Sequence, residues 1–361
     1  MRILTLNPGS SSLKAALVED GTAVGWTAWQ LTEPRLVSDA VHRWARPDAV
    51  AVRFVHGGSH TEPELVTDAL LANLERLAPL APLHQPQSLA VTRAVRALLP
   101  AVPVVACFDT AFHAGLPDAA AHYAVPRAWT RQNRLRRYGF HGLSCAYVVR
   151  RTAALLGRGE TGLHVVCAHL GAGVSVTAVR DGASVDTSMG YTPLEGPAMA
   201  TRSGSIDPGL LLHVMKTASM GPDEMIDVLY TRSGIAGMSG GSGDLGAALA
   251  SAAAGDPDAK CAVDVYVHRL RREIGAAATS LDRLDALVFT GGVAEYQPEA
   301  IATIATGLGV LGLRIAPLER TDADRVISAP DSAAPVLIVR TREELELARG
   351  AEAVLGAGVP G

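Results

Sequence analysis

The chain contains one pattern twice: an apolar run, a turn of small residues, a second apolar run and a closing pair of an acidic residue and glycine. The first copy includes "GSSSLKAALVEDG" at 9–21, and the second includes "GAGVSVTAVRDG" at 171–182, one residue shorter. Apolar runs on both sides of such a turn predict a hairpin. Two copies therefore indicate two related domains, each with a turn of a size suited to a phosphate group.

Length and composition agree with this interpretation. The 361 residues suffice for two ordinary domains. With 48% hydrophobic and 19% charged residues, the chain should form a well-packed soluble globule. A net charge of −4 without a basic stripe argues against nucleic acid as a partner, and the densest basic run, 127–137, should be a solvated face or the rim of a substrate cleft.

The chain also lacks the features of a secreted or membrane protein. Its apolar segments are too short to span a bilayer, and its first residues do not resemble a secretory signal. The four cysteines show no CxxC spacing and should be reduced thiols. We therefore expect a cytoplasmic protein with no membrane partner.

Short apolar runs alternate with segments of helical periodicity, which predicts an α/β fold. We expect strands at 2–6, 13–18, 102–108, 163–170, 286–290 and 336–339. We expect helices at 64–80, 87–99, 144–156, 259–281 and 342–355, the last of them packed against the first domain.

The opening turn follows the first expected strand. Gly9 lets the backbone approach an anion closely, while Ser10, Ser11, Ser12 and Lys14 offer hydrogen-bond donors and a positive charge. The Walker pattern GxxxxGK[ST] does not occur in the chain. The turn is either an anion-binding loop or a serine-rich surface hairpin.

Four further polar residues are candidates for functional roles, because their positions are not explained by packing of an apolar core. Arg53 lies inside an apolar strand three residues before His56, and it is suited to gripping a carboxylate or phosphate unless that strand is an exposed edge. Asp109 follows a buried strand, where α/β proteins place catalytic groups and also helix caps. His141 precedes a helix, as a positioned donor or a structural residue. Arg202 is the expected anion-binding residue of a long polar, glycine-rich loop.

Ten blocks of the chain, in order, resemble signature blocks of the acetate kinases. They are "NPGSSSLK", "VRFVHGG", "APLH", "FDTAFH", "RRYGFHG", "HLGAG", "SVDTSMGYTPLEG", "TRSGSIDP", "TGGVAE" and "TREELELAR". The resemblance implies the actin, sugar-kinase and Hsp70-like (ribonuclease H-like) fold, in which two duplicated α/β domains enclose a cleft. It places the first domain at 1–110 plus about 343–361. The second, at 111–342, would carry the nucleotide loops and the interface of a homodimer.

The same resemblance implies the reaction of acetate with ATP to give acetyl phosphate and ADP, reversibly, with Mg²⁺ or Mn²⁺. The implied catalytic residues bind the carboxylate and phosphoryl groups, donate to the transition state and orient the reacting group: Arg53, Asp109, His141 and Arg202. The implied metal-binding residues are Asn7 and Glu343. The implied acyl pocket consists of Arg53, Val55, Leu83, Phe140 and Pro193.

The implied nucleotide and phosphate contacts lie in the opening turn and in three loops of the second domain. They are Ser10, Ser12, Lys14, His169, Leu170, Gly171, Ala172, Gly173, Asp244, Leu245, Gly246, Gly292, Val293, Ala294, Glu295 and Tyr296. Four of these depart from the family pattern, which has asparagine at Ala172, arginine at Gly246, glycine at Ala294 and asparagine at Tyr296. Pyrophosphate or another nucleotide as donor, and a non-catalytic metabolite-binding homologue, are the alternatives.

Overall fold

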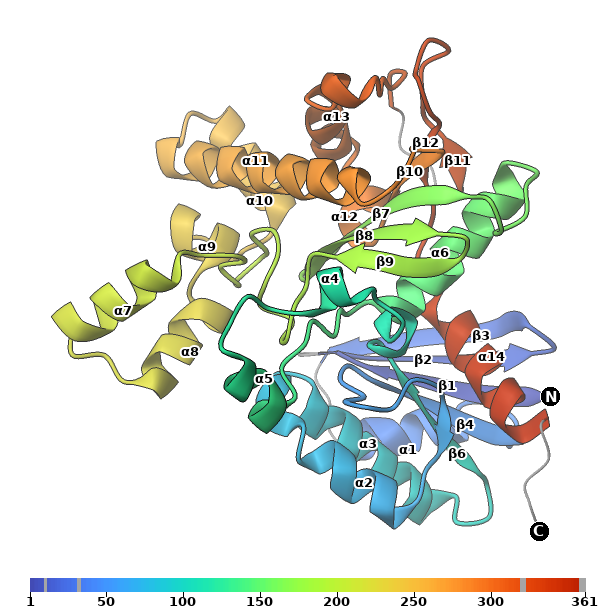
Figure 1. Cartoon of the computed structure of the whole chain (residues 1–361). Coiled ribbons are helices and arrows are strands. Elements are labelled where there is room, and N and C mark those ends of the chain that lie inside the picture. Colours follow the sequence, from blue (N-terminus) through green and yellow to red (C-terminus); the bar gives the residue numbers. More distant parts are fainter. Residues whose placement is uncertain (10–11, 31–33, 319–322, 357–361) are drawn as a thin grey trace. The chain divides into compact units, whose positions relative to one another are not determined.

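The computed structural model describes residues 1–9, 12–30, 34–318 and 323–356, and the chain forms two compact units (Figure 1). The first unit comprises Met1–Ala114, Phe140–Tyr147 and Arg342–Gly361. The second comprises Gly115–Gly139 and Val148–Thr341. The domain boundaries at 110–111 and 342–343 remain a prediction, and the compact units differ from them mainly at 140–147.

Each unit contains one six-stranded sheet, and the two sheets have the same strand order. The first sheet runs β3-β2-β1-β4-β6-β5, from β1 (Arg2–Pro8), β2 (Ser12–Glu19), β3 (Thr22–Gln30), β4 (Ala49–Phe54), β5 (Glu64–Leu65) and β6 (Val104–Phe108). The second runs β9-β8-β7-β10-β12-β11, from β7 (His164–Leu170), β8 (Val174–Arg180), β9 (Ala183–Thr187), β10 (Ala286–Thr290), β11 (Arg325–Val326) and β12 (Val336–Ile338). In both sheets three antiparallel strands are followed by two parallel strands and a two-residue antiparallel edge. The duplication predicted from the repeated turn is therefore confirmed.

The correspondence extends to local backbone geometry. The second and third strands of each sheet change register at one point, between Leu17 and Val18 in one and between Ala178 and Val179 in the other. Each pair then closes through an aspartate and a glycine that both have positive φ, 47° and 77° at 20–21 and 55° and 79° at 181–182. Two consecutive residues with positive φ define a type I′ turn, whose twist matches that of the flanking strands.

Alternation along the strands divides the core of the first unit between two faces. Leu4, Val50 and Val104 pack with helices α1 (Pro34–His42), α2 (Asp68–Glu75) and α3 (Gln85–Leu98). Their chain neighbours Ile3, Ala49 and Val105 pack with α14 (Glu343–Gly356) on the opposite face. The last helix therefore covers the first sheet, as we expected.

The second unit is mainly helical outside its sheet. Its helices are α4 (Asp118–Ala121), α5 (Arg127–Asn133), α7 (Pro208–Thr217), α8 (Pro222–Thr231), α9 (Gly234–Ser239), α10 (Leu245–Ala253), α11 (Pro257–Thr279), α12 (Gly292–Tyr296) and α13 (Pro298–Thr306). Helix α11 packs against α9, α10 and α13 and against strands β7 and β8. Helix α6 (Gly142–Leu155) begins in the first unit and continues in the second. Among the described residues, no helix combines the length and apolar character that crossing a membrane requires.

The helix predicted at 64–80 is wrong in its bounds. Glu64 and Leu65 form the edge strand β5 instead. Helix α2 begins only after Thr67, whose hydroxyl accepts a hydrogen bond from the Leu70 backbone N–H at 3.1 Å. The last predicted residues, Ala78–Leu80, form a separate 3-10 turn that contains a proline. A threonine cap and a proline thus outweigh the apolar periodicity of the segment.

Candidate active site

Polar residues gather at one edge of the first sheet. Asn7 lies near the end of β1, Arg53 near the end of β4 and Asp109 directly after β6. Because β1, β4 and β6 are parallel neighbours, their carboxyl ends meet at the same edge. Glu343 joins them as the first residue of α14. The structure therefore brings together four of the residues predicted to bind substrate or metal.

These four side chains form one continuous hydrogen-bonded chain. The Arg53 guanidinium donates to both carboxylate oxygens of Asp109, at 2.5 Å from Nη2 and at 3.0 and 3.1 Å from Nε. Arg53 Nη1 donates to Asn7 Oδ1 at 3.0 Å, and Asn7 Nδ2 donates to a Glu343 oxygen at 2.5 Å. The order is thus Asp109, Arg53, Asn7, Glu343. Such a chain fixes the direction in which each polar group points.

Burial makes this network electrostatically strong. The Asp109 carboxylate is fully buried, and the Arg53 side chain is 12% exposed. Burial raises the pKa of Asp109 above its ordinary value, against the opposing charge and hydrogen bonds of Arg53. Burial acts to lower the pKa of Arg53, but the charges of Asp109 and Glu343 outweigh it and raise that pKa. Arg53 therefore remains a fixed positive charge beside any bound anion.

His141 is held at the same edge by its backbone. It adopts the left-handed conformation with φ of 59°, which non-glycine residues seldom do. Its backbone hydrogen-bonds to the Asp109 side chain, and the next amide, of Gly142, donates to the Asp109 carbonyl at 3.0 Å. A side chain at Gly142 would place its Cβ 2.1 Å from that carbonyl oxygen. Strained backbone held by its surroundings in this way is typical of functional sites.

The opening turn connects β1 and β2. Gly9 donates its backbone N–H to the Ser12 carbonyl at 2.7 Å. Ser12 begins β2, and Lys14 is exposed and interacts electrostatically with Glu344 at the start of α14. Ser10 lies outside the described residues. The role of this turn in phosphate binding remains a prediction.

In the second unit, two glycine turns meet at the ends of β7 and β10. After β7, Gly171 donates its N–H to the Gly173 carbonyl at 3.0 Å. After β10, Gly291 has φ of 87°, and a Cβ there would lie 2.6 Å from the Leu170 carbonyl oxygen. This close approach requires glycine at position 291. It places the predicted phosphate turn 169–173 beside the loop that contains residues 292–296.

The loop that carries Arg202 lies against the same turn. The Ala200 amide donates to the Ala172 carbonyl at 3.2 Å, and the Ala236 amide donates to the Ala200 carbonyl at 2.9 Å. Arg202 is buried, and its Nη1 donates to the Pro193 carbonyl at 2.7 Å. Arg202 and Pro193 are therefore neighbours, as their predicted roles at one acyl group would require.

The other predicted nucleotide residues lie in the turn after β7, at the start of α10 and in α12. Asp244 caps α10 by accepting the Ala247 amide at 2.7 Å, so its carboxylate has a structural role. The Glu295 carboxylate accepts from Arg340 Nε and from the Thr341 amide, both at 3.0 Å. The side chains of three other predicted residues are buried, which leaves their backbone for a ligand: Leu170, Leu245 and Ala294. Four others are not buried: Ala172, Gly292, Val293 and Tyr296.

The predicted acyl pocket is distributed over both units. Val55 and Phe140 are buried and Leu83 is half-buried, all in the first unit. The Phe140 carbonyl is hydrogen-bonded to His113 Nε2 at 3.0 Å, and its ring lies edge-on to His56. Pro193 belongs to the second unit. That these side chains form one pocket remains a prediction.

A partly buried ion pair in the second unit was not predicted from the sequence. Arg137, which we expected on a solvated face or cleft rim, donates from Nη2 to Glu195 at 2.8 Å, and its side chain is 17% exposed. Tyr123 donates its hydroxyl to the same carboxylate at 2.6 Å. The available signal was a glutamate inside a loop already recognised as functional.

The first-unit residues suit a hard divalent cation. The Glu343 carboxylate offers oxygen atoms, and it lies beside Asn7, whose Nδ2 donates to it at 2.5 Å while the Asn7 amide oxygen accepts from Arg53. Oxygen atoms are the ligands that Mg²⁺ prefers, and Mg²⁺ usually keeps several water molecules. A cation held beside these two side chains would take its remaining ligands from substrate oxygens and water.

Two sheets of identical strand order, each with a small-residue turn between its first two strands, define the class of duplicated two-domain α/β proteins. Within this class, a model of the acetokinase family matches residues 34–349. The chain belongs to the acetokinase family.

Individual relatives agree with that assignment. Acetate kinase of Leifsonia xyli subsp. xyli is 45% identical over 99% of this chain and 90% of the relative. The crystal structure of Porphyromonas gingivalis acetate kinase is 31% identical, with a TM-score of 0.87 over 98% of this chain and 99% of the other. A propionate kinase from Francisella tularensis subsp. tularensis is 32% identical, with a TM-score of 0.90 over the same shares.

Proposed function

We infer that the chain is an acetate kinase, which transfers the γ-phosphoryl group of ATP to acetate and gives acetyl phosphate and ADP. The observation that carries this inference is the buried network of Asp109, Arg53, Asn7 and Glu343 in a member of the acetokinase family. The network presents a fixed cation and metal-binding oxygens at one edge of a sheet. Phosphoryl transfer to a carboxylate requires both.

The reaction is an in-line displacement. A carboxylate oxygen of acetate forms the new bond to the γ-phosphorus, while the bond from that phosphorus to the ADP oxygen breaks and its electron pair leaves with ADP. Arg53 neutralises the acetate carboxylate, and Asp109 fixes its guanidinium by three hydrogen bonds. Arg202 and His141 would donate to the equatorial oxygens of the moving phosphoryl group. Asp109 thus acts mainly by orienting Arg53.

We propose that Asn7 and Glu343 hold Mg²⁺, with Mn²⁺ as a substitute. The 2.5 Å hydrogen bond from Asn7 Nδ2 to Glu343 places these two side chains side by side, which supports this assignment. When bound, the cation would neutralise charge on the donor phosphates. The glycine turns at 171–173 and 291–292 would offer backbone N–H groups to those phosphates, and nearby loops would hold the nucleoside.

Pyrophosphate is a second candidate for the phosphoryl donor. Ala172, Gly246, Ala294 and Tyr296 differ from the family pattern, and Tyr296 is exposed at 45%. Pyrophosphate has no nucleoside and would not need contacts from these positions. ATP remains the first candidate because relatives named acetate kinase, 45% and 42% identical, match 99% and 96% of the chain.

The decisive experiment measures acetyl phosphate formed from acetate and Mg²⁺, trapped as hydroxamate, with ATP, GTP or pyrophosphate in parallel. We expect turnover with ATP. His141→Ala should lower kcat by on the order of 10²–10³-fold, whereas His42→Ala, on an exposed side chain of α1, should not. Turnover with pyrophosphate alone would favour the second candidate. No product with any donor would contradict the kinase assignment, and wild-type turnover in His141→Ala would contradict the role of His141.

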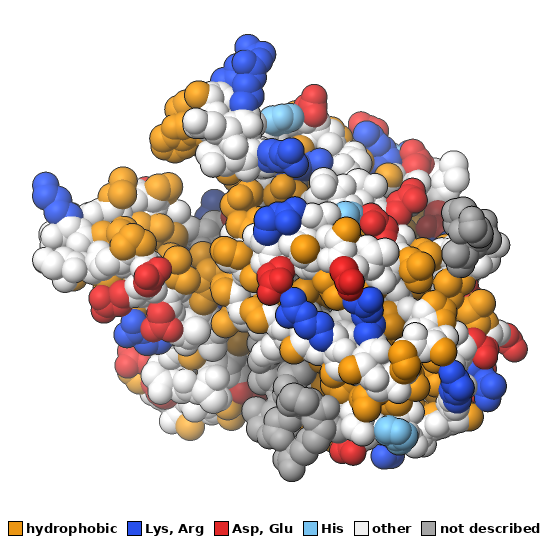
Figure 2. Space-filling model, turned by 90° about the horizontal axis from the view of Figure 1, so that it is seen from below, with side chains coloured by type: hydrophobic (Ala, Val, Ile, Leu, Met, Phe, Trp, Pro, Cys, Tyr) orange, Lys and Arg blue, Asp and Glu red, His pale blue; other side chains and the backbone are white. Residues whose placement is uncertain are grey.

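We further propose that the protein is a cytoplasmic homodimer. Helix α7 supports the dimer because it is apolar in sequence yet has no buried residue, with Leu210 46% and Leu212 69% exposed. Figure 2 shows hydrophobic side chains among charged ones on the left of the view, where Figure 1 places α7 and α8. Exposed apolar patches of this kind commonly mark protein interfaces. Four free cysteines support the compartment.

Light scattering tests the dimer. We expect the wild-type protein to have twice the chain mass of 37.5 kDa. Leu212→Glu should dissociate it, because burying an unpaired charge is costly. Lys216→Ala on the same helix is the control. A wild-type protein of single-chain mass would overturn this proposal without affecting the kinase assignment.

A further inference from the structure

A polar cluster in the second unit lies outside the residues assigned to substrate, donor or metal. It consists of Tyr123, Arg137 and Glu195, and we name it the Glu195 cluster. Glu195 accepts two strong hydrogen bonds, from Arg137 Nη2 at 2.8 Å and from the Tyr123 hydroxyl at 2.6 Å. The Arg137 guanidinium also lies 5.5 Å from the centre of the Tyr123 ring. Each member therefore contacts both of the others.

The cluster also holds the backbone of the neighbouring loop. Arg137 Nη1 donates to the Ser188 carbonyl at 3.1 Å, and the Tyr123 hydroxyl accepts the Tyr191 amide at 2.7 Å. The amide of Tyr138, next to Arg137, donates to the Gly190 carbonyl at 3.0 Å. Both ends of the bend at 188–191 are thus hydrogen-bonded to the cluster or its neighbour in the chain.

Gly190 shows how closely the loop and the cluster pack. An added Cβ there would lie 1.8 Å from a Glu195 carboxylate oxygen and 2.1 Å from the Tyr123 hydroxyl. The Glu195 carboxylate and the Tyr123 hydroxyl would both have to move to make room for it. Position 190 therefore requires glycine while Glu195 keeps its partners.

A polar hollow of about 140 Å³ lies beside the cluster. Its lining includes Arg137, Asp186, Ser188, Glu195, Ser205 and Glu273. Arg137 is the one cation among the described residues of this lining, and it faces three carboxylates. Burial raises the pKa of Glu273. An unneutralised Glu195 would add a further charge to this hollow, which is why its pairing with Arg137 matters to the local structure.

The loop that the cluster holds carries two predicted substrate residues. Pro193 lies two positions before Glu195, and its carbonyl accepts the hydrogen bond from Arg202 at 2.7 Å. One position after Glu195, the Gly196 carbonyl accepts from the Ser205 amide at 2.8 Å, and the Gly196 amide donates to the Ser205 hydroxyl oxygen at 3.1 Å. The loop is closed on itself at these two points. The Glu195 carboxylate is one of the groups that attach the loop to the rest of the unit.

We propose that Glu195 is a positioning residue for the acyl substrate, which sets the place of Pro193 and Arg202 without contacting substrate itself. This proposal rests on the kinase function proposed above. Since Arg137 and Tyr123 fix both carboxylate oxygens, Glu195 cannot rotate, and the Pro193 carbonyl that orients Arg202 is held two residues away. Loss of the carboxylate would let the loop move, and small displacements of positioning groups have large effects on rate.

Steady-state kinetics with Glu195→Gln and Tyr123→Phe tests the proposal. Glu195→Gln keeps the shape but loses the charge, and Tyr123→Phe removes only one hydroxyl. We expect KM for acetate to rise about tenfold in Glu195→Gln and less in Tyr123→Phe, with KM for ATP unchanged in both. The preference for acetate over propionate should fall more in Glu195→Gln than in Tyr123→Phe, because Pro193 forms part of the predicted acyl pocket.

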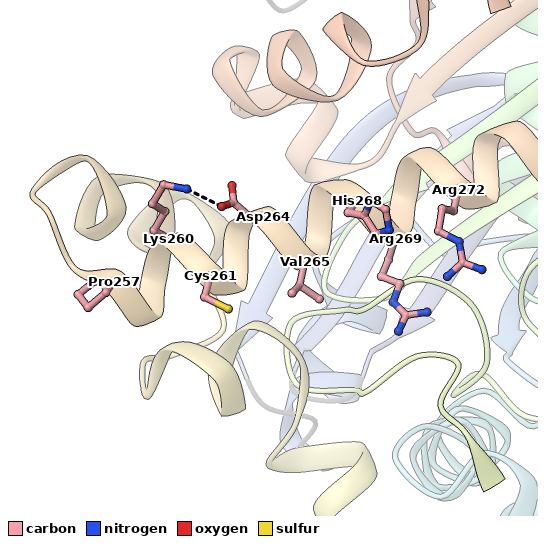
Figure 3. Close-up of a pocket in the computed structure, with 8 residues that line it drawn as sticks. All are labelled: Pro257, Lys260, Cys261, Asp264, Val265, His268, Arg269 and Arg272. Carbon is pink, nitrogen blue, oxygen red and sulfur yellow. Dashed lines mark hydrogen bonds and ion pairs between the residues drawn. The ribbon is translucent and has the colours of Figure 1, made fainter. Parts of the chain in front are cut away.

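The control is Asp264→Asn. It removes a carboxylate of the same unit from the ion pair between Lys260 and Asp264, 2.6 Å long and more than 60% exposed on both sides (Figure 3). This pair lies on the outer face of α11, beside a hollow of about 590 Å³ lined by that helix. We expect wild-type KM values in this variant.

Four outcomes would decide the matter. A selective rise in KM for acetate supports the proposal. A fall in kcat with both KM values unchanged would indicate loss of folded protein only and would overturn it, as would wild-type kinetics in Glu195→Gln. A wild-type enzyme that forms no acyl phosphate with any donor would instead contradict the proposed function, and the two failures are therefore distinguishable.

Discussion

At the scale of single residues, Gly246 and Gln297 form an unusual pair. The Gln297 side chain is half-buried, and a Cβ built on Gly246 would lie 2.5 Å from its Nε2. The carboxamide therefore occupies the space that a side chain at position 246 would use. Since the family pattern has arginine at 246, Gln297 supplies a polar group where that arginine would otherwise stand. We expect it to donate to the nucleotide.

Two alanine substitutions test this expectation. Gln297→Ala should raise KM for ATP about threefold to tenfold, the range of one neutral hydrogen bond. Gly246→Ala should do the same, because its Cβ displaces the carboxamide, and the double variant should be no worse than either. Glu299→Ala, on an exposed side chain of α13, is the control. Additive effects in the double variant would show that the two positions act separately.

Local chemistry accounts for which site residues the sequence revealed. Arg53 was conspicuous as a charge inside an apolar strand, and Asp109 as an acid directly after one. Arg137 was not, because an arginine in a basic run is usually solvated, and its partner Glu195 is 58 positions further along the chain. The bond between Asn7 and Glu343 joins positions 336 apart, so only the family resemblance could suggest it.

At the scale of elements, the two type I′ turns have the same dependence on glycine. Gly21 has φ of 77°, Gly182 has φ of 79°, and a Cβ at Gly21 would meet no atom within 4 Å. Substitution by alanine should therefore destabilise the protein through backbone strain, by about 1–2 kcal/mol at each turn. Asparagine tolerates this conformation better and should cost less.

Urea unfolding of Gly21→Ala, Gly21→Asn, Gly182→Ala and Gly182→Asn provides the measurement. The expected order of stability at both turns is wild type, then asparagine, then alanine. Equal stability of the alanine and asparagine variants would show that a lost contact, rather than backbone strain, controls these turns.

Strands buried on both faces were predictable, whereas exposed edge strands were not. The run 286–290 was predicted with its observed bounds, since all five residues of β10 are buried. Strand β3 has no buried residue, and its Trp26 is 60% exposed. It forms because β2 offers hydrogen bonds on its open side. That pairing is a tertiary interaction, which apolar periodicity cannot report.

At the scale of the whole molecule, a buried histidine should make stability depend on pH. His113 is fully buried, and desolvation lowers its pKa to about 4 from an ordinary value of 6.5, against a hydrogen bond to the Phe140 carbonyl. Below pH 6.5 the unfolded chain binds a proton that the folded protein does not accept. Stability is therefore complete above pH 6.5 and falls progressively toward pH 4, by about 3 kcal/mol in all.

His113→Gln separates this effect from other titrations, because its amide keeps a donor near the position of Nε2. Urea unfolding at several pH values between 4 and 7.5 should show a smaller loss of stability in this variant than in the wild type. Parallel curves for the two proteins would exclude His113 as the source.

The division into two units was predictable only in outline. The repeated turn revealed the duplication, and the strand order confirms it. The membership of residues 140–147 depends on contacts such as that between the Gly142 amide and the Asp109 carbonyl. No local pattern encodes such a contact, and the unit boundary could not be placed from periodicity.

Helix α14 has a consequence for how a ribosome makes this protein. The face of the first sheet that bears Ile3, Ala49 and Val105 is covered by Leu347, Ala348 and Ala351. A nascent chain exposes that face to chaperones for most of its synthesis, since domains fold as their segments emerge. The sheet is covered only after α14 has left the exit tunnel. The docking of α14 also brings Glu343 into contact with Asn7. An incomplete chain therefore lacks both a finished first core and Glu343, one of the two proposed metal ligands.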